Sequence, residues 1–178
     1  MILSDKKILE EMKKGSIVVK PFDVENMGGN SYDVHLSKYF AQYVDKTLDA
    51  KKHNKIKQFE IPKTGFVLKP GQLYLGSTEE YTESHKHVPF LEGKSSTGRL
   101  GIDIHATAGK GDVGFCGYWT LEISSSKPVR IYPGMPIGQL IYYVVDGKVE
   151  RVYSKKKSQK YSNQDKLPKE SMMWKNKF

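Results

Sequence analysis

The hydrophobic positions near the N-terminus predict one amphipathic helix. Ile8, Leu9 and Met12 recur at helical spacing, so they share a face. Ser4 is a favourable N-cap residue, and Gly15 is a favourable terminator. We therefore expect a short helix that ends before Gly15.

From residue 16 onward the pattern changes to short apolar or alternating runs, which predict β-strands. Turn sequences, Lys69-Pro70-Gly71-Gln72 and Tyr132-Pro133-Gly134-Met135, lead into some of them. Many short strands with turns at regular intervals are typical of an all-β barrel or double-sheet fold. The predicted strands include residues 17–19, 32–36, 73–75 and 137–145.

Two connecting segments carry predictions of their own. Asp146-Gly147 favours a tight hairpin turn, with a further strand at residues 148–152. Residues 45–57 are polar and rich in lysine, so we expect a surface loop or an irregular hairpin there.

The composition indicates a single domain that needs no disulfide or structural metal. The chain has 178 residues, of which 38% are hydrophobic, and Cys116 is its single cysteine. No apolar run approaches the ~20 residues of a membrane span, and the N-terminus lacks the apolar stretch of a signal peptide. We therefore expect a soluble, cytoplasmic protein, in the host cytoplasm if its source is a virus.

The positive charge is concentrated at the C-terminal end. The net charge is +9, from 29 Lys and Arg against 20 Asp and Glu, and residues 151–178 alone hold nine basic and two acidic side chains. A nearly neutral body with a basic tail indicates an anionic partner, such as nucleic acid, a membrane surface or the phosphates of a nucleotide. Charge alone leaves a merely solvated terminus equally open.

Three motif assignments fail. Gly109-Lys110-Gly111-Asp112-Val113-Gly114 spells a dinucleotide-binding fingerprint, but a turn and a strand are predicted after it in place of the required helix. Gly93-Lys94-Ser95 resembles the end of a phosphate-binding loop, yet Val88 stands where that loop requires glycine. The zinc deaminases need His-x-Glu and a cysteine pair, which this chain lacks. Any deamination must proceed without zinc.

Residues 94–99 are a candidate anion site. Hydroxyl side chains follow Gly93, and Arg99 lies four residues past Ser95. As a helical turn, this segment would offer free N–H groups, with Ser95 and Arg99 on one face. An ordinary capped turn with a surface arginine fits the same residues.

The strand predicted around Glu122 carries this carboxylate on its outer face. Alternation directs one apolar set toward the core and a more polar set away from it. An isolated glutamate there can simply be solvated, but the glycines before the strand allow a ligand to approach closely. The inner set is Trp119, Leu121 and Ile123, and the outer set is Tyr118, Thr120 and Glu122.

Short motifs are spread in order over most of the chain. They are Met1-Ile2-Leu3-Ser4-Asp5, Asn30-Ser31-Tyr32-Asp33-Val34, Lys94-Ser95-Ser96-x-x-Arg99-Leu100-Gly101, Thr107-Ala108-Gly109, Asp112-x-Gly114-Phe115-x-Gly117, Thr120-Leu121-Glu122, Pro133-Gly134-Met135-x-Ile137-Gly138-Gln139-Leu140 and Lys160-Tyr161-x-Asn163-Gln164. In this order and spacing they resemble the dCTP deaminase family of the dUTPase superfamily. Lys94 departs from the arginine usual in that family.

The resemblance implies a fold and an assembly. The fold would be an all-β, dUTPase-like subunit, a β-clip or distorted jelly roll with a short N-terminal helix, that forms a homotrimer with active sites between subunits. Residues 1–152 would form the β domain, and residues 153–178 a basic segment that closes over the nucleotide triphosphate. Mg²⁺ would enter with the nucleotide and be held mainly by the triphosphate, with no zinc and no metal ligand from the chain.

The resemblance also implies roles for individual residues. Glu122 would act as general base and acid, while Ser95, Arg99 and the backbone of Ala106 and Ala108 would hold water near C4 of cytosine. Asp112 would accept the 3′-hydroxyl, and backbone groups from Thr120 through Leu121 to Glu122 would contact the base edge. The other predicted nucleotide contacts are Lys94, Ser96, Thr97, Gly98, Gln139 and, over the triphosphate, Tyr153, Lys160 and Gln164.

The implied activity is deamination of dCTP to dUTP and ammonia in the supply of pyrimidine deoxynucleotides, with dTTP as a candidate inhibitor. Two relatives of this activity remain open: a plain dUTPase, and a bifunctional enzyme that forms dUMP and diphosphate. Thr107-Ala108-Gly109 and Gln139 resemble the bifunctional branch, whereas Lys110-Gly111 differs from it. A non-catalytic nucleic-acid-binding or regulatory protein is the alternative of another class, and it predicts salt-sensitive DNA affinity without turnover. We expect neither a membrane nor a specific nucleic acid as partner.

Overall fold

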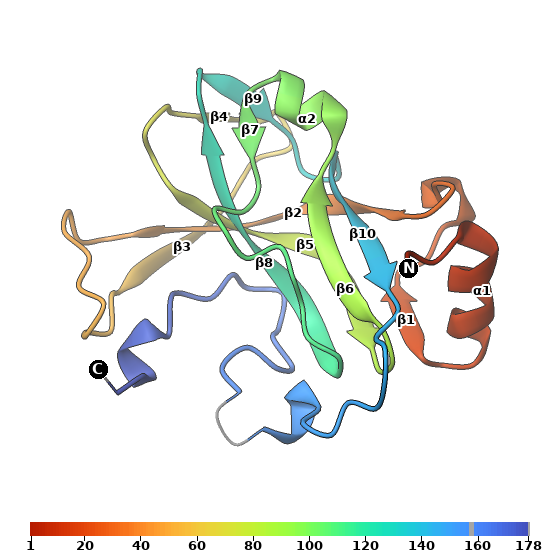
Figure 1. Ribbon diagram of the computed structural model, residues 1–178. Coiled ribbons are helices and arrows are strands. Elements are labelled where there is room, and N and C mark those ends of the chain that lie inside the picture. Colours follow the sequence, from red (N-terminus) through yellow and green to blue (C-terminus); the bar gives the residue numbers. More distant parts are fainter. Residues whose placement is uncertain (157–158, 178) are drawn as a thin grey trace.

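The computed structural model describes residues 1–156 and 159–177, and its regular elements are mostly β-strands (Figure 1). The all-β prediction with a short N-terminal helix is confirmed. The strands are β1 (Ile17–Lys20), β2 (Tyr32–Tyr43), β3 (Ile56–Glu60), β4 (Phe66–Leu68), β5 (Tyr74–Ser84), β6 (Val88–Gly93), β7 (Ile102–Asp103), β8 (Phe115–Ser125), β9 (Val129–Ile131) and β10 (Pro136–Tyr143). The helices are α1 (Asp5–Lys13) and α2 (Ser95–Arg99), with short 3₁₀ turns η1 (Val24–Asn26), η2 (Tyr153–Lys155) and η3 (Met173–Lys175).

Helix α1 begins and ends where the sequence predicts. The Ser4 hydroxyl accepts a hydrogen bond from the Lys7 N–H at 3.3 Å, and Gly15 follows the helix with a φ of +69°, a conformation that favours glycine. Ile8 is fully buried. Within the described residues, no helix has both the length and the apolar character needed to cross a bilayer.

The main sheet is antiparallel and is organised around three long strands. Its path is β6-β10-β2-β5-β8-β7, with β1 added to β5 and β3 added to β2, while β4 and β9 form a separate pair. Figure 1 shows β2, β5 and β8 in the middle of the molecule and β4 and β9 at one end. Strands β10 and β3 pair with different halves of β2, and β1 and β2 pair with different halves of β5. The long strands therefore connect all parts of the sheet.

A buried carboxylate replaces ladder hydrogen bonds where the strand pairing shifts. The register is interrupted between Leu36 and Phe40 in β2 and between Ser77 and Tyr81 in β5. Glu80, in this gap, is buried and accepts from the His35 N–H at 2.9 Å, and its other oxygen lies 2.6 Å from His35 Nδ1. Burial raises the pKa of Glu80, although the contacts with His35 oppose that shift. The pair satisfies polar groups that the bulges leave unpaired.

Strand β8 alternates as predicted. Its burial pattern places every second side chain in the core, and the outer set remains half-buried. The inner set, Trp119, Leu121 and Ile123, belongs to the main hydrophobic cluster. One strand therefore has the core on one side and a polar surface on the other.

The predictions for two connecting segments have different outcomes. Tyr43 pairs opposite Ile56, so β2, β3 and the segment between them form the predicted hairpin. The strand predicted at residues 148–152 is wrong, because Gly147 turns the chain with a φ of +87° and the segment then continues to η2 without joining the sheet. Val152 packs over Gly114 instead, where a Cβ on that glycine would lie 2.2 Å from the valine Cγ1.

Acid titration tests how much the Glu11 carboxylate stabilises the junction between α1 and β1. Its carboxylate accepts from the Ser16 hydroxyl at 2.6 Å and pairs with Lys14 at 3.0 Å, and these contacts lower its pKa from the usual 4.5 to about 2. Since the folded-state pKa is lowered, its contribution is complete above pH 4.5 and is lost as the pH falls toward 2. At pH 6, Glu11→Gln should lower the free energy of unfolding by about 1.5 kcal/mol.

Urea unfolding between pH 6 and pH 2 measures this contribution. The gap between wild type and Glu11→Gln should narrow with acid, whereas the exposed control Glu150→Gln should change little at any pH. A gap that stays constant down to pH 2 would show that the charge of Glu11 is not responsible.

Candidate active site

The outer face of β8 forms the floor of a cavity of about 760 Å³. Tyr118, Thr120 and Glu122 line it at two-residue spacing. Leu75 of β5 pairs directly opposite Glu122 and therefore lies on the same face of the sheet. The floor combines a carboxylate with apolar surface.

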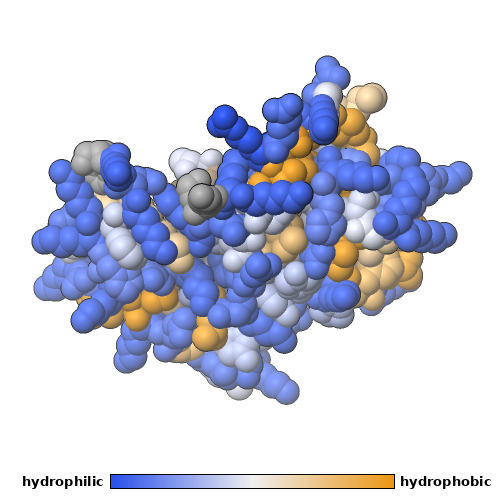
Figure 2. Space-filling view, turned by 90° about the horizontal axis from the view of Figure 1, so that it is seen from below, coloured by the Kyte–Doolittle hydropathy of each residue, from blue (hydrophilic) through white to orange (hydrophobic). Residues whose placement is uncertain are grey.

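Two segments that are distant in sequence form the walls of this cavity. One is the loop before β8, and the other is the C-terminal tail, defined here as residues 153–156 and 159–177. The tail lies below the sheet in Figure 1, and the surface seen from that side is mostly hydrophilic with separate hydrophobic patches (Figure 2). The lining residues of the loop are Ala106, Thr107, Ala108, Lys110, Gly111 and Asp112, and those of the tail are Tyr153, Lys160, Tyr161, Gln164, Lys169, Glu170 and Ser171.

The Glu122 carboxylate is held in a fixed orientation. Its Oε2 accepts a hydrogen bond from the Ala106 N–H at 3.0 Å, and its own N–H donates to the Ile104 carbonyl at 2.9 Å. Oε1 accepts no hydrogen bond from the described residues. One oxygen is thus anchored, and the other is available to a ligand or a water molecule.

The tail docks on the edge of β8 through backbone hydrogen bonds. The Asn163 N–H donates to the Cys116 carbonyl at 2.8 Å, and the Tyr118 N–H donates to the Gln164 carbonyl at 3.1 Å. These contacts form a parallel bridge between Gly117 and Gln164. The tail thereby satisfies polar groups at a part of β8 that β7, paired only with Ser124 and Ser125, does not cover.

Side chains fix the rest of the tail against the cavity. The Thr120 hydroxyl accepts from the Gln164 side-chain amide and from the Lys169 N–H, the latter at 3.1 Å. The Tyr153 hydroxyl accepts from the N–H groups of Lys160 and Tyr161 at 3.3 and 3.0 Å. Predicted site residues therefore hold the tail in place as well as line the cavity.

Tyr43 connects the tail to the hairpin formed by β2 and β3. Its hydroxyl accepts from the Ser171 N–H at 2.9 Å, and burial raises its pKa. His53, in the loop of the same hairpin, lies 2.7 Å from Glu170. Burial acts to raise the pKa of Glu170, but hydrogen bonds from its own backbone and from His53 outweigh burial and hold the pKa below its usual value.

Cations gather around Asp112 at the other end of the cavity. Lys110 Nζ lies 2.9 Å from the Asp112 carboxylate, and Lys156 Nζ lies 3.9 Å from it. All three side chains are partly exposed, so these ion pairs can exchange for contacts with an anionic ligand at little cost. The charges fit a substrate that carries phosphates.

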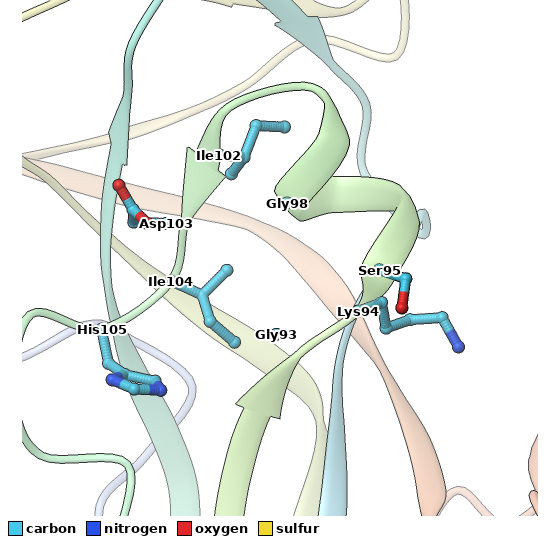
Figure 3. A pocket seen from close by; sticks show the side chains of 8 residues that line it. All are labelled: Gly93, Lys94, Ser95, Gly98, Ile102, Asp103, Ile104 and His105. Carbon is cyan, nitrogen blue, oxygen red and sulfur yellow. The ribbon is translucent and has the colours of Figure 1, made fainter.

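The predicted residues around α2 do not line the Glu122 cavity within one chain. Lys94, Ser95 and Gly98 line a second cavity of about 320 Å³, together with Ile104 and His105. Figure 3 shows Lys94 and Ser95 at the start of α2, with His105 on the opposite side of this cavity. The lysine ammonium pairs with Asp33. The helical turn predicted for this segment is confirmed, but its binding role stays a prediction.

The remaining predicted residues lie outside both cavities. Thr97 is buried and its hydroxyl donates to the Lys94 carbonyl at 2.8 Å, while the Leu121 side chain is in the core. The Gln139 side-chain amide donates to the Gly93 carbonyl at 3.3 Å. Ser96 and Arg99 are exposed on α2.

Several residues of the Glu122 cavity were not among the individual contacts predicted from the sequence. Leu75 follows a predicted turn and pairs with β8. Its position could therefore be predicted by pairing the two predicted strands. The sequence around Tyr43, Lys169 and Glu170 does not indicate an individual role at the cavity, because long-range contacts bring these residues there. Among these residues are Tyr43, Leu48, Leu73, Leu75, Tyr161, Lys169, Glu170 and Ser171.

An oriented carboxylate in a cavity bordered by lysines can transfer protons and attract an anionic ligand. The chain belongs to the dCTP deaminase-like family, whose model matches residues 2–145. It is 51% identical over 163 residues to the "dCTP deaminase, dUMP-forming" of Clostridium acetobutylicum, covering 92% of this chain and 91% of that protein. A protein of the same name from Cytophaga hutchinsonii is 48% identical over 156 residues, with 88% and 90% covered.

A solved structure shares the fold. The 2′-deoxycytidine 5′-triphosphate deaminase from Agrobacterium tumefaciens matches with a TM-score of 0.65 at 21% sequence identity, over 81% of this chain. This chain spans 48% of the length of that longer chain. The family resemblance noted in the sequence is confirmed by the family model and the curated relatives.

Substitution of Gly117 should release the tail from β8. Gly117 has a φ of +141°, and an added Cβ would lie 2.8 Å from the backbone nitrogen of Gln164. Strain of about 1–3 kcal/mol should oppose docking in Gly117→Ala. Trypsin should then cut at the tail lysines about tenfold faster or more, since 1.4 kcal/mol is a factor of ten.

Gly29→Ala is the matched control, because a Cβ there meets no atom within 4 Å and its backbone conformation accepts one. Equal tail cleavage in both variants would contradict the docking contact at Gly117.

Proposed function

We propose that this chain converts dCTP and two water molecules into dUMP, diphosphate and ammonia. The observation that carries the proposal is the Glu122 carboxylate, anchored by the Ala106 N–H with one oxygen directed to no protein donor in the described part of the chain. The curated relatives, which carry the name "dCTP deaminase, dUMP-forming", support the bifunctional product. They favour it over dUTP as the end product.

The proposed deamination is a hydrolysis in which Glu122 moves protons. A water molecule beside Oε1 gives a proton to the carboxylate as its oxygen attacks C4 of cytosine. The carboxyl group then protonates N3. The carboxylate next takes the proton of the new C4 hydroxyl and passes it to the amino group, so that the tetrahedral intermediate collapses to a uracil ring and ammonia. Backbone groups of Ala106 and Ala108 would hold the water, as Ser95 and Arg99 would from another copy of the chain.

The direction of the cavity supports one orientation of the nucleotide. The outer-face lining of β8 runs from Tyr118 to Glu122, which is about 13 Å for four residue steps. The base would lie at the Glu122 end, beside Leu73 and Leu75. The sugar and phosphates would extend toward Asp112, with Lys110 and Lys160 as charge partners. Contacts from Thr120 or Leu121 to the base stay a prediction, and the Glu122 N–H is already bonded to Ile104.

The second proposed step breaks the bond between the α- and β-phosphates. Water attacks the α-phosphorus of dUTP, diphosphate leaves, and a proton passes to the surroundings. Mg²⁺ bound to the triphosphate would neutralise the charge that develops on the diphosphate. The residues present fit this arrangement, because the Asp112 carboxylate is paired with lysines and the cavity offers cations to the phosphates.

We also propose a homotrimer in which α2 of a neighbouring copy completes the cavity. Residues 104 and 105 line the small cavity and residues 106–108 line the large one, so a single loop separates the two sites. Ser96 and Arg99 are exposed and line neither of these two cavities. An adjacent copy would therefore bring Lys94, Ser95 and Arg99 to the nucleotide. The same site would admit dTTP as an inhibitor.

The location of the basic tail supports a nucleotide over DNA as its partner. Lys160 and Lys169 line the cavity wall, and Lys169 pairs with Asp165 at 2.9 Å. A tail that bound DNA would have to leave these contacts.

Glu122→Gln tests the proposed base. The amide keeps the size of the side chain but cannot accept a proton, so ammonia release should fall by about 10²–10⁴-fold while dCTP still binds. Single-turnover ammonia assays and equilibrium dCTP binding measure the two effects. Glu79→Gln, an exposed carboxylate on β5, is the control and should keep full activity. Deamination at the wild-type rate in Glu122→Gln would exclude Glu122 as the base.

Product analysis tests the second step. With dCTP and Mg²⁺, anion-exchange separation should show dUMP and diphosphate in the same molar amount as ammonia. Accumulation of dUTP with no dUMP would show that the chain deaminates dCTP but does not carry out the second step. Unreacted dCTP, with turnover of added dUTP, would identify a plain dUTPase.

A further inference from the structure

Glu83, His85 and Cys116 form a side-chain cluster that the proposed reaction does not use. Their ligand atoms, one from each residue, all lie within 4.8 Å of one another. We propose that these three side chains bind one zinc ion, with water as the fourth ligand. The site lies on β5, β8 and the residue that follows β5, outside the lining of the Glu122 cavity, and this inference is independent of the proposed function.

The strand pairing brings the three side chains to one face. Glu83 and Cys116 are direct partners in the antiparallel pairing of β5 with β8. His85 is two residues past Glu83, so it points to the same side. Its backbone N–H donates to the Ser16 carbonyl at 2.9 Å, which fixes it beyond the end of β5. The sheet register thus determines the cluster.

Neighbouring side chains already hold the Glu83 carboxylate in an orientation that suits a metal ligand. Tyr81 donates its hydroxyl hydrogen to Glu83 Oε1 at 2.9 Å, and Glu83 Oε2 lies 2.7 Å from His85 Nε2. Zinc ligands commonly have such outer partners, which hold their orientation. The exposed His85 side chain leaves a path for the ion from solvent.

The donor set selects the metal. One nitrogen, one sulfur and one carboxylate oxygen suit zinc, whereas Mg²⁺ and Ca²⁺ prefer oxygen ligands alone. Zn–N and Zn–S distances of about 2.0 and 2.3 Å require ligand atoms about 3.5 Å apart in a tetrahedral site. Side-chain rotation of the exposed His85 and the partly exposed Glu83 provides this adjustment.

Binding requires proton displacement and no redox change. The Cys116 thiol releases one proton to solvent and binds as thiolate, while the imidazole carries its proton on Nδ1 and binds through Nε2. The carboxylate binds as it stands.

Cobalt(II) is the probe that identifies the ligands. The full chain, freed of metal with a chelator and kept reduced, should bind one Co²⁺ per chain with an intense near-ultraviolet thiolate-to-cobalt band. Zn²⁺ should abolish this band, and millimolar Mg²⁺ should not. Binding without a thiolate band, or no binding at all, would overturn the proposal.

Variants assign the individual ligands. Cys116→Ser should remove the band, and His85→Gln and Glu83→Gln should weaken Zn²⁺ binding by more than the about 10- to 100-fold expected for the outer partner in Tyr81→Phe. His53→Gln is the control, because it removes another exposed histidine that pairs with a glutamate. His85 is exposed, so His85→Gln should fold as wild type does even if Cys116→Ser does not. Unchanged Zn²⁺ affinity in His85→Gln would overturn the site.

Discussion

The register between β5 and β8 is the constraint on which both the fold and the site depend. Side chains alternate across a strand, so a slip of one residue would turn Glu122 into the core and Leu121 into the cavity. The observed pairing sets Leu75 opposite Glu122 and Glu83 opposite Cys116. The bulge between Ser77 and Tyr81, with buried Glu80, fixes the two halves of β5 in this arrangement.

The cavity is assembled from parts that no short segment could provide. Strand β8 supplies Glu122, the preceding loop supplies the N–H that orients it, and the tail supplies cations and a wall. Each part is fixed mainly by backbone hydrogen bonds, from Ala106, Asn163 and Tyr118. Rigid backbone contacts hold a carboxylate more closely than loop side chains could, which suits proton transfer over short distances.

The sequence was informative where local pattern decides structure. Alternation around Glu122 predicted its outward face, and Ser4 with Gly15 predicted α1. The strand at residues 148–152 failed because a turn sequence shows where the chain reverses but not whether a partner strand is within reach. Tyr43 and Glu170 were missed for the same reason: their contacts join the β2–β3 hairpin to the tail, more than a hundred residues apart in the sequence.

Because the tail belongs to the same chain as the floor it covers, its docking is an intramolecular equilibrium. A tethered segment meets its site at an effective concentration on the order of millimolar, which a free peptide would need to match in solution. The hydrogen bonds at Gly117 and Thr120 therefore hold this wall against β8 without the affinity that a separate peptide would need.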